Sequence, residues 1–172
     1  MKPPFLITVL LMLMSCSEQA GPKTNPLSSQ ELIALNKERH IAEMTWIRNY
    51  IATLNMTMQE GSTGFYYTRF EQGNDSIKPG DEVEIDYHIF HLTTPAYTQE
   101  IFHDRKAIKV ENDNSEIGIH QALQLLLKGD SAIFIMPSHL AFGLTGNKMV
   151  NPNTPLLYTI RVLPDNKTHA IE

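Results

Sequence analysis

The sequence predicts an α+β fold, in which helices cover a mostly antiparallel sheet. Three observations lead to this expectation. Residues 29–60 contain no glycine or proline, and they carry apolar side chains at helical spacing. Several later segments are rich in β-branched and aromatic residues, and residues 83–89 alternate apolar and polar side chains with a period of two. A further helical segment, residues 116–127, interrupts these strands and must cover the sheet that they form.

The chain begins with a segment typical of protein export. Lys2 precedes an apolar run over residues 5–14, which is shorter than the roughly 20 residues that a membrane-spanning helix needs. We therefore expect a signal peptide over residues 1–15. The end of this run, Leu13-Met14-Ser15-Cys16, resembles the bacterial lipobox, in which the cysteine becomes lipidated and forms the new N-terminus.

The position of the chain's one cysteine supports this interpretation. Because Cys16 has no partner cysteine, the chain contains neither an internal disulfide framework nor a cysteine-based metal cluster. We expect Cys16 to carry a lipid that anchors the protein in the bacterial cell envelope, on the periplasmic face or at the outer membrane. The alternative is an ordinary signal peptide that happens to end near a cysteine.

A tether and a long helix are expected next. Residues 16–28 are polar and contain Gly21, Pro22 and Pro26, a composition that favours a flexible linker. Ser28 precedes Glu31 by three residues, which is the form of a capping box. We predict a helix over residues 29–54 within an N-terminal helical segment of residues 29–60. Its apolar side carries Ile41, Met44, Ile47, Ile51 and Leu54, and it either packs on the domain behind it or forms a dimer or partner surface.

The strands are expected at residues 65–70, 83–89, 96–102, 107–111, 131–136 and 156–163, with a charged turn over residues 103–106. The strand over residues 131–136 is apolar on both faces. One face should lie in the core beneath the short helix. We expect the other to be covered by the N-terminal helix around Ile47 and Ile51, or by a partner.

Several classes of function leave no mark on this chain. The formal net charge is −5 and no basic cluster is present, so we expect no binding to nucleic acid. No serine lies in a nucleophile elbow, and no glycine loop has the form that binds phosphate.

The seven histidines show no metal-ligand spacing. His88 and His91 should leave opposite faces of a strand. The other five are scattered along the chain, so we expect no metal site and no cofactor; they are His40, His103, His120, His139 and His169.

Four short motifs occur in a characteristic order: Gly80 with Tyr87 seven residues later, Gly118-Ile119, Lys128-Gly129-Asp130, and Pro137 through Gly143. Through them, residues 64–163 resemble the FKBP-type peptidyl-prolyl cis-trans isomerases. The resemblance implies an FKBP-like curved antiparallel sheet with a short helix packed across it, in a domain of residues 61–172. The order of lipobox, helix, Gly-Phe-Tyr-Tyr strand and domain is most similar to the gliding-motility-associated FKBP-type lipoproteins of the Bacteroidetes.

The resemblance also implies which residues form the pocket for the proline ring. The catalytic positions of the family fall on Tyr87, Ile101, Phe142 and Tyr158. Further substrate-binding positions fall on Phe102, Ile108, Glu116 and Ile119. Without the motif order, the periodicity alone favours Tyr87, Phe142 and Tyr158 as core aromatics of a sheet.

Several of these positions depart from the family pattern. Phe142 stands where the family has a tyrosine that donates a hydrogen bond to the ligand, and Phe102 stands where it has an aspartate. Ile119 replaces a frequent tryptophan of the pocket floor. The contact at Glu116 is made by the backbone N–H, so it can persist. A pocket with fewer donors and fewer aromatics predicts weak isomerase activity.

Two functions from different classes are therefore expected. The first is a membrane-anchored isomerase that acts on proline-containing segments of exported proteins, including gliding-motility components. The second is a lipoprotein of the same fold that binds or assembles partners in an envelope complex with little turnover, because fold alone does not settle function.

Overall fold

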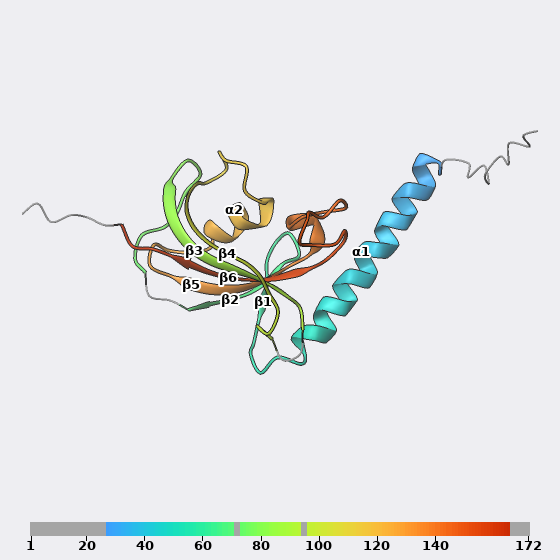
Figure 1. Ribbon diagram of the computed structural model, residues 1–172, viewed down its shortest axis with the longest axis horizontal. Coiled ribbons are helices and arrows are strands. Elements are labelled where there is room, and N and C mark those ends of the chain that lie inside the picture. Colours follow the sequence, from blue (N-terminus) through green and yellow to red (C-terminus); the bar gives the residue numbers. More distant parts are fainter. Residues whose placement is uncertain (1–26, 71–72, 94–95, 166–172) are drawn as a thin grey trace, which may run out of the picture.

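The computed structural model describes residues 27–70, 73–93 and 96–165. Cys16, the expected signal peptide over residues 1–15 and most of the expected tether lie outside the described residues. None of the helices within the described residues has the length and apolarity needed to cross a membrane. The elements, shown in Figure 1, are α1 (Ser29–Ile51), β1 (Gln59–Glu60), β2 (Tyr66–Phe70), β3 (Glu82–His91), β4 (Glu100–Lys109), α2 (Ile117–Leu123), β5 (Ser131–Met136), the 3-10 helix η1 (Ser138–Leu140) and β6 (Leu156–Val162).

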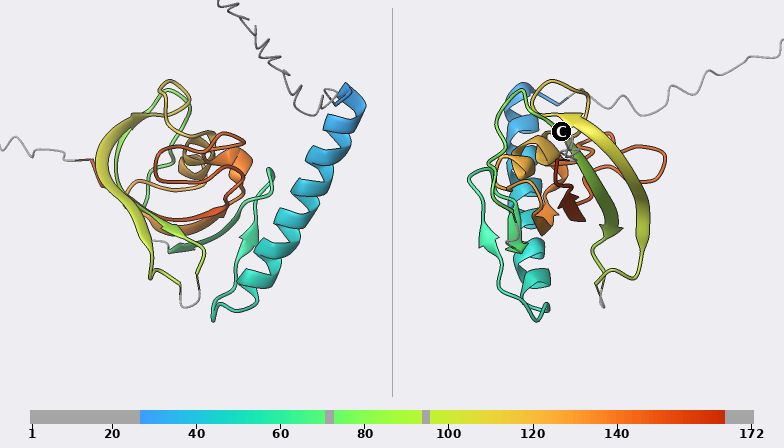
Figure 2. Two further views of the ribbon diagram at one scale, coloured as in Figure 1. Left: turned by 45° about the vertical axis from the view of Figure 1, so that its right-hand side comes forward. Right: turned by 90° about the vertical axis from the view of Figure 1, so that its left-hand side faces the viewer.

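The strands form one sheet in the order β1-β2-β5-β6-β3-β4, and every neighbouring pair is antiparallel. Figure 2 shows that the sheet curves around α2, whereas α1 lies against its opposite side. The expected α+β fold is confirmed. We call the side that carries α2 the inner face and the side that carries α1 the outer face.

Helix α1 starts where the capping box predicts. The Ser28 hydroxyl accepts a hydrogen bond from the Glu31 N–H at 3.3 Å, and Glu31 Oε2 accepts one from the Ser28 N–H at 2.8 Å. The bonds from Ser28 hold the pKa of the Glu31 carboxyl below its usual value. The helix ends at Ile51, three residues before the predicted end, and the expected helical segment of residues 29–60 finishes as strand β1.

The two faces of β5 carry different clusters of apolar side chains. Ala132, Phe134 and Met136 point into the inner cluster, which also contains the buried residues of α2. Ile133 and Ile135 belong to the outer cluster, in which Met44, Ile47 and Tyr50 of α1 cover the sheet. The outer cluster also contains Tyr66, Phe90 and Leu157. The prediction that the N-terminal helix covers the second face of this strand is confirmed.

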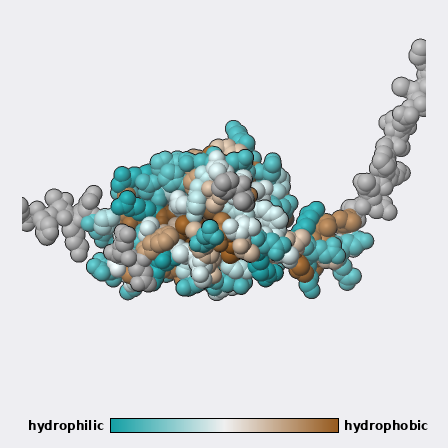
Figure 3. Space-filling model, turned by 90° about the horizontal axis from the view of Figure 1, so that it is seen from below, coloured by the Kyte–Doolittle hydropathy of each residue, from teal (hydrophilic) through white to brown (hydrophobic). Residues whose placement is uncertain are grey.

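The first half of α1 extends beyond the sheet, as Figures 1 and 2 show. The side chains of Leu32, Ile33 and Ile41 are 45%, 68% and 53% exposed. Figure 3 shows apolar surface on this projecting part of the molecule. The sequence placed Ile41 on the packed side of the helix. That part of the prediction is wrong, because Ile41 lies about 120° round the helix from the buried Ile47 and faces away from the sheet.

Strand β4 runs without a break from Glu100 to Lys109, so the predicted turn over residues 103–106 is wrong. Its charged residues lie on a strand at the edge of the sheet, where side chains reach solvent and charges discourage pairing with another chain. The chain instead turns between β3 and β4, after His91.

Helix α2 is shorter than predicted and ends at Leu123. Gly118 allows it to approach the chain after β5 closely, since a Cβ at this position would lie 2.5 Å from Met136 Sδ and 2.7 Å from the Leu140 carbonyl oxygen. The turn into β5 is held by Asp130, a fully buried residue whose carboxylate accepts from the N–H groups of Gly73 at 3.0 Å and Leu127 at 2.9 Å. The motifs Gly118-Ile119 and Lys128-Gly129-Asp130 therefore each contain a residue that the fold itself requires.

Candidate functional site

An apolar hollow of about 210 Å³ opens on the inner side of the sheet, next to the start of α2. Residues from β3, β4, the segment before α2 and the loop after η1 meet there. They are Tyr87, Ile89, Ile101, Phe102, Glu116, Phe142, Asn147, Met149 and Val150. Five of the eight pocket positions expected from the sequence therefore border this hollow.

Tyr87 reaches the hollow because its strand alternates. Val83, Ile85, Tyr87 and Ile89 all belong to the inner cluster, as expected for a period of two. The Tyr87 ring lies against the Phe102 ring at 5.9 Å between centroids, and Lys106 Nζ lies 5.6 Å from the Tyr87 centroid. The Tyr87 and Phe102 rings form one wall of the hollow.

Ile101 reaches the hollow because β4 contains a bulge. Along β3 the pairing advances by one residue, from Ile89 to Phe90, but along β4 it advances by two, from Phe102 to Glu100. Ile101 is the extra residue. Adjacent residues of a regular strand point to opposite faces, whereas a bulge redirects a side chain. Both Ile101 and Phe102 can therefore border the same hollow.

The hydroxyl of Tyr87 is the polar group of this wall. Burial of the ring raises its pKa to about 12, and the nearby carboxylates of Glu116 and Asp104 act in the same direction. The hydroxyl therefore remains protonated throughout the neutral pH range. It can donate a hydrogen bond to a carbonyl oxygen of a bound peptide.

The other three expected pocket residues lie deeper. Tyr158, Ile108 and Ile119 are fully buried in the inner cluster and do not border the hollow. The Tyr158 hydroxyl is buried without a hydrogen-bond partner among the described residues, and burial raises its pKa far above the usual value. These residues support the hollow from behind.

Four residues that border the hollow were not singled out from the sequence: Ile89, Asn147, Met149 and Val150. The last three belong to the loop before β6. Asn147 shapes that loop, because its Oδ1 accepts from the N–H groups of Met149 at 2.8 Å and Val150 at 2.7 Å. The glycine and asparagine of this loop were visible in the sequence as turn signals, but which side chains face inward depends on the turn geometry.

Comparisons with known proteins identify the family of the chain. The profile of the family described as FKBP-type peptidyl-prolyl cis-trans isomerase matches residues 73–163. The chain belongs to this family. FKBP-type enzymes isomerise X-Pro peptide bonds, so proline-containing segments are the substrates of this domain. No curated protein sequence matches the chain.

Solved structures of FKBP-type proteins share the fold. FkpA from Escherichia coli is 19% identical, with a TM-score of 0.60 over 80% of this chain and 73% of that one. A peptidyl-prolyl cis-trans isomerase from Pseudomonas syringae is 20% identical, with a TM-score of 0.58 over 71% of this chain and 92% of that one. The N-terminal domain of FKBP42 from Arabidopsis thaliana is 15% identical, with a TM-score of 0.56 over 65% and 94%. The expected FKBP-like fold is confirmed.

The apolar hollow suits a reaction that breaks no covalent bond. Twisting a peptide bond costs about 18–20 kcal/mol because it destroys amide resonance. A pocket lowers this barrier when it removes water from the carbonyl and fits the twisted amide better than either planar form. The wall of Tyr87, Ile101, Phe102 and Phe142 provides such an apolar surface.

The histidines are less scattered in space than in the sequence. His40 and His139 meet Glu43 between α1 and η1, and His88 meets His103 beside Asp86 on the outer face of β3 and β4. Histidines that show no ligand spacing along the chain thus gather into two clusters in the fold. Contacts between segments that are distant in the chain cannot be seen from residue spacing.

Proposed function

We propose that this FKBP-type isomerase turns over slowly and that it assists the folding of exported proteins from a lipid anchor in the bacterial envelope. The observation that supports slow turnover is the composition of the hollow. Its wall offers the Tyr87 hydroxyl, whereas Phe142 and Phe102 bring aromatic surface without a strong donor or acceptor.

The proposal gives Tyr87 and the wall different roles. The apolar side chains hold the proline ring and exclude water from the preceding carbonyl, which weakens the hydrogen bonds that favour the planar amide. The Tyr87 hydroxyl donates to a peptide carbonyl and so positions the substrate. An uncatalysed X-Pro bond takes tens to hundreds of seconds to isomerise, so even a modest acceleration speeds the folding of a client protein.

The isomerase activity is tested most directly with Phe142→Tyr. Residues 27–172 should accelerate isomerisation of an X-Pro tetrapeptide and refolding of a proline-limited protein. The added hydroxyl lies at the hollow, where a further hydrogen bond worth about 0.5–1.5 kcal/mol in the transition state raises kcat/KM by a few-fold to about tenfold. Phe70→Tyr is the control, because Phe70 is 45% exposed and does not border this hollow.

The envelope anchor is tested with Cys16→Ser. We expect the wild-type chain in the membrane fraction and the variant in the soluble fraction after osmotic release, because lipidation needs the thiol. Unchanged processing and membrane association of the variant would remove the lipoprotein part of the proposal. The isomerase part would remain.

A second function is favoured by the exposed apolar residues in the first half of α1. Such a surface suits a lipoprotein that binds partners in an envelope complex, for example a gliding-motility apparatus. Failure of both the wild-type chain and Phe142→Tyr to accelerate X-Pro isomerisation above background would favour this second function over the first.

A further inference from the structure

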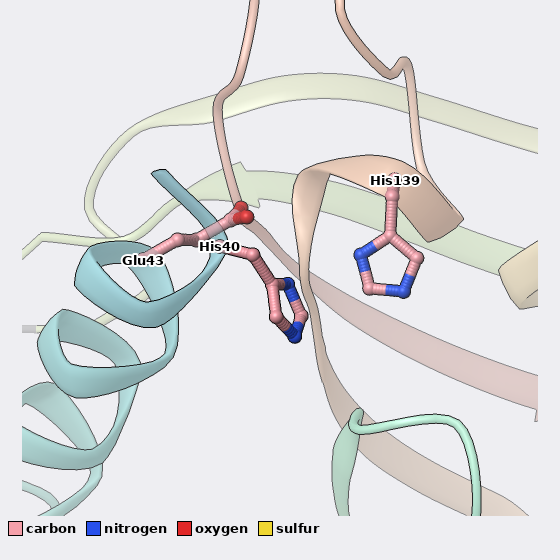
Figure 4. A group of neighbouring side chains, drawn as sticks. All are labelled: His40, Glu43 and His139. Carbon is pink, nitrogen blue, oxygen red and sulfur yellow. The ribbon is translucent and has the colours of Figure 1, made fainter. Parts of the chain in front are cut away.

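A cluster of two imidazoles and a carboxylate lies where α1 leaves the sheet. His40 and Glu43 are three residues apart on α1, so they share one side of the helix. His139 belongs to η1, on the other side of the junction. Figure 4 shows His40 and Glu43 extending from the helix towards His139. One ligand atom of each of the three residues lies within 4.8 Å of the others.

Glu43 is held in place by the residue next to His139. Its Oε1 accepts from the Ser138 N–H at 2.6 Å and its Oε2 accepts from the Ser138 hydroxyl at 3.1 Å. A carboxylate has about four acceptor positions, so both oxygens keep a lone pair for a further partner. Hydrogen bonds of this kind behind a ligand fix its orientation in metal sites.

The spacing of the two imidazoles matches that of two ligands on one tetrahedral ion. Imidazole nitrogens lie about 2.0–2.1 Å from zinc, which places the ring centres about 3.2 Å from the ion and about 5.2 Å from each other at a tetrahedral angle. The centres of the His40 and His139 rings are 5.4 Å apart, with an angle of 74° between their planes.

The second histidine cluster does not meet this requirement. The rings of His88 and His103 are stacked, with centres 3.9 Å apart and an angle of 1° between their planes. On one ion, that separation corresponds to an angle of about 75° between the two ligands, well below the tetrahedral value. Their nitrogens also face Asp86 Oδ1, at 2.9 Å from His103 Nε2 and 3.8 Å from His88 Nε2.

We propose that His40, Glu43 and His139 bind a single divalent transition-metal ion of the Zn²⁺ class. Two imidazoles and one carboxylate form a ligand set that zinc accepts, with the fourth position open to water. The adjacent hollow of about 290 Å³, bordered by the same three residues, leaves room for that water. Because the ligands come from α1 and η1, the ion links the helix to the domain. The link at His40 lies one helical turn N-terminal to Met44, the first buried residue of α1.

The test uses the full chain, purified in detergent without a histidine tag and titrated with Zn²⁺ against a chromogenic chelator. We expect one ion per chain. His40→Ala and His139→Ala should each weaken binding by at least tenfold, since even the partners behind ligands contribute about 10–100-fold. His103→Ala is the matched control and should leave affinity unchanged. Ca²⁺ should not compete, because it prefers six to eight oxygen ligands.

Limited proteolysis tests whether the ion holds α1 against the domain. Lys37 and Arg39 are exposed on α1, so trypsin can cut there when the helix opens locally. Zn²⁺ should slow this cleavage in wild type and in His103→Ala, and it should not do so in His139→Ala. Arg39 also borders the hollow, and its charge opposes a cation, so Arg39→Gln should bind Zn²⁺ a few-fold more tightly.

Three results would overturn the proposal. The first is an affinity that does not change in His40→Ala and His139→Ala. The second is loss of binding in His103→Ala, which would place the ion at the stacked pair. The third is half an ion per chain, which would mean that the ion joins two copies. Isomerase activity is not part of this test, so its absence leaves the metal proposal unaffected.

Discussion

The inner and outer faces of the sheet are covered by helices of very different character. Five of the seven residues of α2 are buried, whereas α1 has 23 residues and buries only three. Helix α2 is therefore an integral part of the core, and the hollow beside Tyr87 opens next to its start. Helix α1 is a layer added from outside, and its buried residues Met44, Ile47 and Tyr50 cover the outer face of the sheet. The inner face thus has the Tyr87 hollow beside an integral helix, whereas the outer face is covered by a helix that only partly packs on it.

Removal of α1 should have the largest effect. A chain that starts at residue 57 exposes Ile135, Leu157 and Phe90, which the helix covers in the intact protein. Burial of Met44 and Ile47 alone contributes about 3–6 kcal/mol by the usual value for apolar side chains. We expect aggregation, measured by light scattering and by binding of a hydrophobic dye. A truncated chain that stays monomeric and equally stable would show that α1 is not needed to cover this face.

A matched pair of substitutions compares the two helices directly. Ile119 in α2 and Ile47 in α1 are both fully buried. Each change to alanine should lower the free energy of unfolding, by about 2–5 kcal/mol for a residue of the central core. We expect Ile119→Ala also to reduce kcat/KM, because Ile119 lies behind the hollow, and Ile47→Ala to leave kcat/KM unchanged. Equal losses of activity in the two variants would contradict the separation of the faces.

Much of this comparison was predictable from the sequence, because local patterns determine it. The capping box at Ser28 and Glu31, the alternation of residues 83–89 and the two apolar faces of β5 all depend on residues near one another in the chain. The side of α1 that packs on the sheet depends on the tertiary structure. Ile41 continues the helical stripe in the sequence, but Met44, Ile47 and Tyr50 pack on the sheet and Ile41 is exposed.

The order of the motifs in the sequence predicted part of the hollow. Tyr87 and Phe142 border the hollow as expected, whereas Tyr158 does not. The bulge at Ile101 leaves no signal in the sequence, because it depends on how two strands pair. The meeting of His40 with His139 likewise depends on a helix and a turn that lie about one hundred residues apart. Contacts of that kind follow from the tertiary structure alone.

The smallest effect is expected from Tyr158→Phe. The change removes a buried hydroxyl that has no hydrogen-bond partner among the described residues. An unsatisfied buried polar group costs about 1–3 kcal/mol, so the variant should be as stable as wild type or more stable by about 1 kcal/mol. Its kcat/KM should stay within about twofold, since the ring does not border the hollow. Denaturant unfolding measures the stability and the tetrapeptide assay measures kcat/KM. A tenfold loss of activity would show that the Tyr158 hydroxyl takes part in the reaction.

The place of β6 in the sheet determines when the domain can fold. It is the last strand along the described chain, yet it lies between β5 and β3 and pairs with both. Until it is present, β1-β2-β5 and β3-β4 remain two separate ribbons, each with an unpaired edge that faces inward. During synthesis, which starts at the N-terminus, the chain therefore cannot complete the sheet before residues 156–162 have been made. The long sequence separation of these pairings also favours slow folding, so this catalyst of slow folding steps needs the final part of its own chain before it has a pocket.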